Sequence, residues 1–282
     1  MRRSSLPLPI LLLAFGLAPA AVAGQHPPTT DGPVEGLDFR VYDGGGTARS
    51  FAELLAALDA ADVLLVGETH DDATGHAVEV EILARAAQRV GRLGDAGVGR
   101  SVLLSLEMFE RDVQYILDEY LEGLITEEQF KSSARPWDRY DTDYRPMVEF
   151  ARAHDLPVVA ANAPRRYVNR VSRLGPGSLE ELPDRAKAFL PPLPYPGPSE
   201  TYTRQWNELM EEMREAVDSV DAADGARKDG RPSDDRPTSD PLPSAPRHDM
   251  GNALQAQALW DAAMAHAVAG ALERHPGALV VH

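Results

Sequence analysis

The chain has 282 residues, 44 of them acidic and 28 basic, which gives a formal net charge of −16 at pH 7. This excess of negative charge argues against nucleic-acid binding, because phosphate backbones are held by Lys and Arg. The absence of cysteine excludes disulfides, thiolate nucleophiles, Cys-ligated zinc or iron–sulfur clusters and covalent c-type haem. Hydrophobic residues make up 43% of the chain, which is enough for a real core in one large domain or two small ones.

The first 23 residues have the pattern of a secretory signal peptide. Arg2 and Arg3 precede an apolar run over residues 10–17, and a small-x-small cleavage site ends at Ala23. We therefore predict a signal peptide over residues 1–23 and an exported protein, periplasmic or extracellular. An uncleaved N-terminal anchor is the alternative. The chain also lacks the cysteine that a lipoprotein needs after its apolar run.

The region after the leader has the pattern of an α/β domain. Leu37, Phe39 and Val41 alternate with polar residues like a short strand, and Ser50 can cap the helix that follows. Four short apolar runs then indicate strands that are covered on both faces. These runs span residues 63–66, 102–106, 158–161 and 278–281.

Helical patterns separate these apolar runs. Thr126 and Gln129 form a capping box that marks the start of one helix. Because parallel neighbours need long crossovers, the alternation predicts an α/β fold with a largely parallel sheet flanked by helices. The expected helices span about 75–90, much of 109–154, 202–220 and 252–272.

Two segments are predicted to lie outside the packed core. Residues 24–35 are polar and rich in proline, so we expect a flexible leader. Residues 221–248 consist almost entirely of Asp, Pro, Ser, Arg and Gly, which predicts a disordered insertion. The remaining organisation is one α/β domain over residues 36–282 that contains this insertion.

Chemically reactive side chains follow each predicted strand. Glu68 and His70 come after the first strand, Glu107 after the second, Asn162 after the third and His282 after the last. Ligands of open α/β sheets sit outside the carboxyl ends of the strands. We therefore expect these side chains to meet at one edge of the sheet, in one cavity.

A group of Glu and His residues lies around the end of the first strand. Glu68 and His70 share one face of an extended backbone, and His76 is followed at i+3 by Glu79 on the next helix. Such a group can hold a divalent metal, and histidine can also act as acid or base near neutral pH. The alternative is that Glu68 or Asp71 only caps the helix and that the histidines are structural.

Other candidates have structural alternatives too. Glu107 can pair with Arg111 at i+4 if both lie on a helix, and Asn162 can be the N-cap of the following helix. On the last helix, Gln257 and Asp261 share a face that points either to solvent or into a cleft. The sequence has no GxGxxG, Walker loop, GxSxG or HExxH motif, so nucleotide binding and α/β-hydrolase chemistry lose their usual support.

Several motifs resemble, in order, those of the ChaN family. This is a group of bacterial iron-regulated haem-binding lipoproteins in a haem-uptake/Tiki superfamily that also contains erythromycin esterases and Tiki metalloproteases. The likeness extends from about Val63 to the last residue. The motifs are Gly67-Glu68-Thr69-His70-Asp71 with His76, Leu106-Glu107-Met108-Phe109 with Gln114, Asn162-Ala163-Pro164, and the run from Gln257 to Ala265.

The resemblance implies an α/β core with a small helical subdomain. It also implies non-covalent haem or iron binding at a surface pocket or between the two copies of a homodimer, with a tyrosine as iron ligand, which suits a chain without cysteine. Tyr195, Tyr202 and Tyr167 are the candidate ligands, and Gln257 and Asp261 are further cofactor-binding candidates. For each tyrosine the alternative is a ring buried in the core with a bonded hydroxyl.

The chain departs from this family in two respects. Members generally continue past the last strand into a Gly-rich turn and another histidine, whereas this chain stops at His282, so a C-terminal truncation is expected. Members are often lipid-anchored, and this chain lacks the cysteine, so at most peripheral membrane association is expected.

Three functions follow from the sequence. The preferred one is an exported haem- or iron-binding protein in iron uptake, with haem or an iron complex as partner. The alternative is a metal-dependent hydrolase similar to Tiki proteases and erythromycin esterases, in which a metal activates water. The third is a non-catalytic interaction module. The metal-ligand candidates are Glu68, His70, His76, Glu107 and His282, and Glu68, His70 and Glu107 are the candidate catalytic residues.

Overall fold

The structure is a computed structural model that describes most of the chain between residues 34 and 282. The described residues are 34, 36–91, 93, 99–212 and 252–282. The predicted signal peptide, nearly all of the leader, residues 213–220 of a predicted helix and the predicted insertion lie outside them, and those predictions stay untested. Among the described residues, no helix has the length and apolar character needed to span a bilayer.

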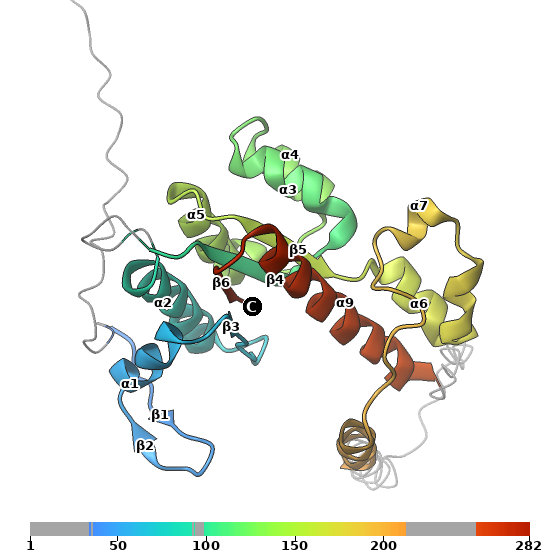
Figure 1. The fold of residues 1–282 in the computed structure, drawn as a ribbon, viewed down its shortest axis with the longest axis horizontal. Coiled ribbons are helices and arrows are strands. Elements are labelled where there is room, and N and C mark those ends of the chain that lie inside the picture. Colours follow the sequence, from blue (N-terminus) through green and yellow to red (C-terminus); the bar gives the residue numbers. More distant parts are fainter. Residues whose placement is uncertain (1–33, 35, 92, 94–98, 213–251) are drawn as a thin grey trace, which may run out of the picture.

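The described chain alternates helices with short strands (Figure 1). The strands are β1 (Val41–Tyr42), β2 (Ala48–Arg49), β3 (Val63–Leu64), β4 (Val102–Glu110), β5 (Val158–Asn162) and β6 (Leu279–Val281). The α-helices are α1 (Phe51–Ala56), α2 (Ala73–Arg89), α3 (Gln114–Leu121), α4 (Glu127–Ala134), α5 (Arg145–Ala153), α6 (Arg165–Leu174), α7 (Asp184–Lys187) and α9 (Ala253–Arg274), and residues 200–212 are also helical. Short helical turns are η1 (Ala57–Asp59), η2 (Arg111–Val113), η3 (Tyr140–Tyr144) and η4 (Pro176–Glu181).

The main sheet has four parallel strands in the order β3-β6-β4-β5, which confirms the predicted α/β class with a parallel sheet. The strand at the end of the chain therefore lies between β3 and β4, where Val280 pairs with Val63 and Val281 with Leu104. The ladder hydrogen bonds of β3 end at Leu64, although the backbone N–H of Val66 still donates to the carbonyl of His282 at 2.6 Å. Placing β6 in the interior brings the ends of β3, β6 and β4 side by side.

Helices cover both faces of this sheet, which explains why its strands are continuous apolar runs. Alternate residues of a strand point to opposite faces. Leu104, Leu106 and Val281 pack with α2 and α5 in the larger core. Leu103 and Val280 pack on the opposite face under the second half of α9. Figure 1 shows α9 crossing this face from the helical subdomain to β6.

A small helical subdomain lies beside the sheet and has its own core, in agreement with the expected architecture. It is built from α6, η4 and the first half of α9. The helix α9 thus belongs to two cores, so the position of the subdomain relative to the sheet is fixed by one rigid element. The fully buried side chains of this core include Val171, Leu179 and Leu259.

Local sequence signals set several helix starts. Ser50 caps α1 in a capping box with Glu53, and Thr126 caps α4 in a capping box with Gln129, as predicted. The predicted strand over residues 37–41 is wrong, because regular pairing starts only at Val41, in the β1–β2 hairpin. Strand β4 is longer than predicted and includes Phe109, which had been expected to begin a helical region.

Arg100 joins the starts of three strands and was not singled out by the sequence. Its Nε donates to the carbonyl of Gly277 at 2.8 Å, its Nη1 to Ala61 at 2.7 Å and its Nη2 to Ala278 at 2.8 Å. Its Nη2 also pairs with Asp62. These bonds hold the amino ends of β3, β4 and β6 in register, and the opposite ends of the same strands carry the site.

Candidate functional site

The carboxyl ends of β3, β6 and β4 open into a cavity of about 160 Å³. Its walls include Glu68, His70, Glu107 and His282. Side chains that follow β3 and β6 and one from within β4 therefore reach one cavity, near the strand ends where ligand sites of open α/β sheets lie. Glu79 of α2 also lines the cavity. Asn162, at the end of β5, does not, and it forms no part of this site.

Glu68 is the most heavily bonded carboxylate of the cavity. The hydroxyl of Tyr144 donates to its Oε1 at 2.9 Å, and Nδ1 of His70 bonds to the same oxygen. Its Oε2 lies 3.5 Å from Nε2 of His76. Burial, followed by the bonded Glu68 carboxylate, raises the pKa of Tyr144 well above its usual value, so Tyr144 remains a proton donor to Glu68.

His76 is buried beside Glu68 without a regular hydrogen bond. Its ring is 3% exposed, and neither ring nitrogen has a hydrogen-bond partner among the described residues. Nδ1 lies 3.8 Å from Oδ2 of Asp143, which is itself paired with Arg139 at 2.8 Å. Buried polar atoms without partners cost free energy. The two bare nitrogens therefore indicate a place where a further group binds.

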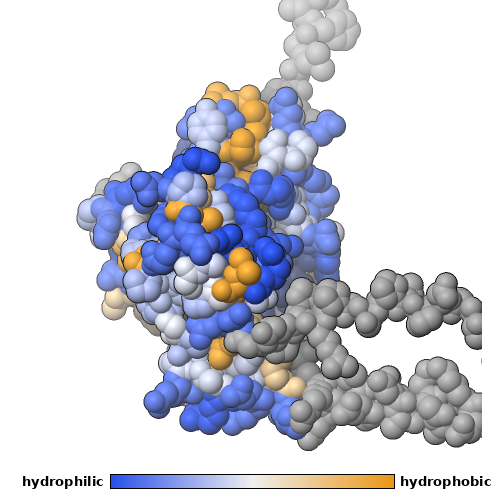
Figure 2. Space-filling model, turned by 90° about the vertical axis from the view of Figure 1, so that its right-hand side faces the viewer, coloured by the Kyte–Doolittle hydropathy of each residue, from blue (hydrophilic) through white to orange (hydrophobic). Residues whose placement is uncertain are grey.

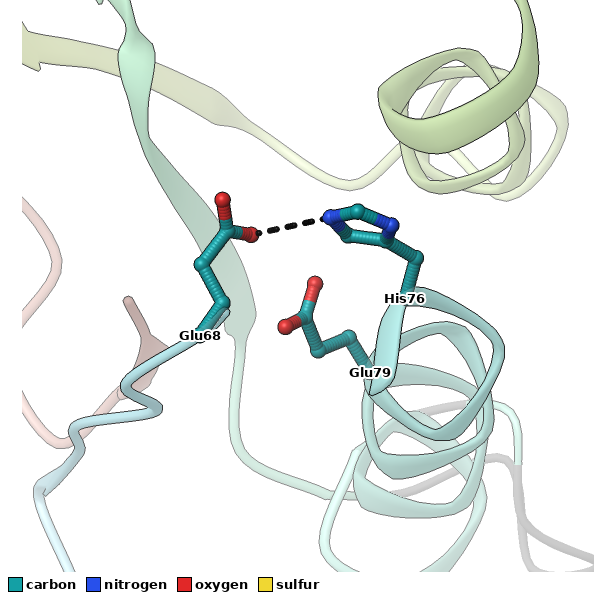
Figure 3. Close-up of side chains that lie close together, drawn as sticks. All are labelled: Glu68, His76 and Glu79. Atoms are coloured by element: carbon teal, nitrogen blue, oxygen red, sulfur yellow. Dashed lines mark ion pairs between the residues drawn. The ribbon is translucent and has the colours of Figure 1, made fainter. Parts of the chain in front are cut away.

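Glu68, His76 and Glu79 form a group with the geometry of a metal site (Figure 3). Each offers one ligand atom, and these atoms lie within 4.8 Å of one another. Glu68 comes from the loop after β3, whereas His76 and Glu79 point from adjacent turns of α2 toward it (Figure 3). Carboxylate oxygens with one imidazole nitrogen suit a divalent cation such as zinc, manganese or iron.

This group differs from the ligand set predicted from the sequence. His70 is mostly exposed and uses its Nδ1 on Glu68, while Glu107 and His282 line the cavity outside the three-residue group. Glu79 was part of the Glu/His group that its i+3 spacing from His76 indicated, but it was not among the metal-ligand candidates named from the sequence.

Two carboxyl groups of the cavity have raised pKa values. Burial, followed by the charge of Glu68, raises the pKa of Glu79 to about 6. Burial also raises the pKa of Glu107, and the nearby charges of Glu68 and Asp261 add to this effect. A cavity that collects carboxylates in this way favours a cation, because positive charge relieves both the burial cost and the repulsion.

We expect the stability of the metal-free protein to fall as pH rises from about 4.5 to about 6, through the titration of Glu79. Its pKa is raised from 4.5 to about 6, so the folded state binds this proton more tightly than the unfolded state. The stabilisation is complete below the unfolded pKa and is lost as pH passes the folded one. Its size is about 1–2 kcal/mol, reduced by partial exposure. Chemical denaturation with a chelator present should show a flatter profile for Glu79→Gln over this range, and an unchanged profile would contradict the assignment.

The alternative in which Glu68 or Asp71 caps the following helix is wrong. Asp72 is the N-cap of α2, with its Oδ1 accepting from the backbone N–H of Thr74 at 2.9 Å. Asp72 has an extended backbone, as an N-cap requires, while Glu68 lies further upstream. Glu68 is therefore free to bond to Tyr144 and His70.

Two other structural alternatives are also wrong. Glu107 cannot pair with Arg111 on a helix surface, because Glu107 lies inside β4. Asn162 is the last residue of β5, and the N-cap of α6 is Pro164, which makes no side-chain capping bond. In both cases the strand extends further than the apolar run indicated, because pairing between β4 and β5 continues to Glu110 and Asn162.

His282 is fixed at the end of β6 by neighbouring strands. Its backbone N–H donates to the carbonyl of Leu64 at 2.9 Å, and its Nδ1 lies 2.9 Å from Oγ of Ser105. Burial lowers the pKa of His282 below its usual value. The ring therefore favours the neutral form, whose nitrogens can accept a proton or bind a metal.

The three predicted tyrosines have different environments. Tyr195 is buried and its hydroxyl donates to the carbonyl of Gln255 at 2.8 Å, which is the arrangement of the structural alternative. Tyr167 packs against the subdomain core with the guanidinium of Arg166 4.6 Å from its ring centre. Tyr202 differs from both, because it lies partly exposed beside a carboxylate.

Tyr202, Asp261 and Gln257 form a second polar group on the face of α9. Burial raises the pKa of Asp261, and the neighbouring Tyr202 hydroxyl and Gln257 amide oppose this shift. Burial, followed by the charge of Asp261, raises the pKa of Tyr202. The charge of Asp261 also acts on Glu107, so this group lies within electrostatic range of the strand-end cavity.

These features define an α/β protein with a carboxylate- and imidazole-lined cavity at its strand ends and a helical subdomain beside it. Residues 54–282 match the family described as "Haem-binding uptake, Tiki superfamily, ChaN", and the chain belongs to this family. The match confirms the resemblance that the ordered motifs indicated.

One solved structure resembles the fold at a TM-score of 0.50 and 16% sequence identity. It is described as "Cofacial heme binding to ChaN of Campylobacter jejuni", and the alignment covers 86% of this chain and 78% of that chain. At this identity the likeness shows the fold alone. No curated protein matches the chain.

Proposed function

We propose that the protein binds haem non-covalently, as a ChaN-type protein, and serves iron uptake outside the cytoplasm. The family match over residues 54–282 carries the proposal. The structurally similar protein is described as binding haem cofacially. A chain without cysteine also suits a haem that is not covalently attached.

Tyr202 is the iron ligand that we propose. A phenol oxygen must lose its proton to bind iron strongly, and the Asp261 carboxylate lies near Tyr202 and can accept that proton. Gln257 holds the same carboxylate in place. When bound, haem supplies an iron centre that accepts an anionic oxygen ligand. By contrast, the hydroxyl of Tyr195 is already engaged with a backbone carbonyl.

Apolar contact area on the subdomain comes from partly buried side chains. Tyr167, Leu193 and Trp260 pack against the subdomain core without being fully covered. Figure 2 looks onto the side of the molecule where the subdomain lies, and this side is mainly hydrophilic with separate hydrophobic patches. A porphyrin must therefore use a confined apolar wall and not a broad exposed surface.

A hemin titration tests this function. We expect a saturable shift of the Soret band with a defined stoichiometry, because each protein molecule has a fixed number of haem sites. Absorbance that rises linearly without saturation, as adsorption gives, would contradict haem binding. Light scattering on the hemin-loaded protein distinguishes a surface pocket on a monomer from a site between two copies, which gives twice the monomer mass.

Export is the second part of the proposal and is supported by the signal-peptide pattern at the N-terminus. Two arginines, an apolar run and a small-x-small site end at Ala23. We expect protein recovered from the periplasm or medium of an expressing bacterium to begin at Gly24. Intact-mass measurement checks this, and recovery of the full-length chain from the membrane would favour the anchor alternative.

A divalent-metal site is the second candidate function, and one observation favours it. His76 is buried with both ring nitrogens unbonded among the described residues, and it faces Glu68 and Glu79. When bound, a metal there lowers the pKa of coordinated water and polarises carbonyl groups. Glu107, in the same cavity, has a raised pKa and can exchange a proton with such a water. Metal analysis of the purified protein tests this site.

A further inference from the structure

A second cleft, of about 580 Å³, lies beside the first residues of β4 and β5, outside the strand-end cavity. It follows the outer edge of β5, between the start of α3 and the second half of α9, and shares no wall residue with the strand-end cavity. Gln114 covers part of this sheet edge, because its amide bonds to the carbonyl of Val158 at 2.9 Å and to the N–H of Ala160 at 2.7 Å. The rest of the cleft is open.

Two guanidinium groups face this cleft. Arg111 lies at the start of η2 and Arg274 at the end of α9. Neither forms an ion pair within the described part of the chain, and Nη1 of Arg111 is buried without a hydrogen-bond partner. Burial, followed by the charge of Arg274, lowers the pKa of Arg111, so the two cations lie within range of one another.

This arrangement is unusual for a chain with 44 acidic and 28 basic residues. An acidic protein can pair its arginines readily, and a buried guanidinium nitrogen without an acceptor, such as Nη1 of Arg111, costs free energy. Gly270 is part of the same wall, where a Cβ would lie 3.2 Å from Nη1 of Arg274. Glycine inside a helix costs stability relative to alanine, and here its effect is to leave space for the Arg274 side chain.

Two carboxylates also line the cleft, and neither forms an ion pair with Arg111 or Arg274 within the described residues. Asp118 accepts from the amide of Gln114 at 2.8 Å, which occupies one of its oxygens, and Glu273 is exposed. Burial, followed by the charge of Arg111, lowers the pKa of His266, and the charge of Glu273 opposes this shift. His275 completes the set of titratable groups on the walls.

We propose that this cleft binds a small organic oxyanion, held by the guanidinium groups of Arg111 and Arg274. The planar fork of arginine donates two parallel hydrogen bonds to a carboxylate or a phosphate. The cleft volume lies in the range of small-molecule sites, about 300–1,000 Å³. An oxyanion between the two cations relieves their repulsion and supplies the acceptor that Nη1 of Arg111 lacks.

Calorimetric titration of the full chain at low ionic strength tests the proposal with two probes, citrate and inorganic phosphate. We expect saturable binding of at least one probe and about a tenfold or greater loss of affinity in Arg111→Gln. Arg173→Gln is the matched control, because Arg173 lies on α6 away from the cleft and bonds to Asn169. Saturation by citrate alone identifies a carboxylate ligand, and saturation by phosphate alone identifies a phosphate ligand.

Two outcomes would overturn the proposal. One is the absence of saturable heat with either probe, and the other is an equal loss in Arg111→Gln and Arg173→Gln, which would reflect net charge only. If Arg111→Gln does not fold, Arg274→Gln replaces it, since Arg274 is exposed at the helix end and its removal leaves the core intact. The same tenfold loss is then expected.

Discussion

Replacing His76 with alanine is expected to remove tight divalent-metal binding, with a loss of affinity of about a hundredfold or more. His76 supplies the single nitrogen ligand of the Glu68, His76 and Glu79 group, and its ring is held in place by burial against Tyr144. Without it, two carboxylates remain, and carboxylates alone bind such metals weakly unless more oxygens join them. Dialysis against zinc or manganese followed by elemental analysis measures the change.

A matched control is available on another helix. His154 lies exposed after α5, with its ring 4.4 Å from that of Phe150 and outside the cavity, so His154→Ala should leave metal content unchanged. Circular dichroism checks that each variant folds. If His76→Ala does not fold, Glu79→Gln tests the same site, because it keeps the side-chain shape and removes one ligand charge. A folded His76→Ala or Glu79→Gln variant that retains near-stoichiometric metal would refute the site.

Replacing Tyr202 with phenylalanine is expected to have the second large effect, on the affinity for hemin and on the spectrum of the hemin complex. This change keeps the ring and removes only the hydroxyl, so the packing is preserved while the iron loses its proposed oxygen ligand. We expect an altered Soret position and a loss of affinity of about tenfold or more. Tyr115→Phe is the control, because Tyr115 is 70% exposed on α3.

The two parts of the haem proposal can fail separately. If wild-type protein saturates with hemin and Tyr202→Phe has the same spectrum, haem binding stands and the Tyr202 assignment is wrong. If wild-type protein does not saturate, the haem function itself is wrong. Asp261→Asn adds a further distinction, because the amide cannot accept the phenol proton. It should weaken hemin binding more at low pH than at high pH, where the phenol loses its proton more readily.

Much of the fold followed from short-range patterns in the sequence. The apolar runs at residues 63–66 and 278–281 contain β3 and β6, the run at 158–161 forms all of β5 except its last residue, and the caps predicted at Ser50 and Thr126 start helices. These signals are local, because a capping side chain bonds to a backbone N–H only three residues further along the chain.

Other features depended on contacts between distant segments. Strand β4 extends to Glu110 although two of its last four residues are glutamates, because β5 pairs with it as far as Asn162. Asp72, and not the Glu68 or Asp71 considered from the sequence, is the N-cap of α2, because its backbone is extended and its side chain bonds to Thr74. From the sequence alone, the residues at the end of β4 fit a helix as well as a strand, and several acidic residues before α2 fit an N-cap.

The sequence by itself determined the α/β class, the resemblance to the family and the presence of Glu and His residues near strand ends, because periodicity, caps and motifs act over a few residues. Only the tertiary structure decided which of these residues meet. The interior position of β6 brought His282 beside Ser105, the direction of α2 brought Glu79 and His76 to Glu68, and the course of α9 placed Arg274 near Arg111. Contacts of this kind join residues that lie far apart in the sequence. They are set by strand order and helix packing, and no local sequence pattern encodes them.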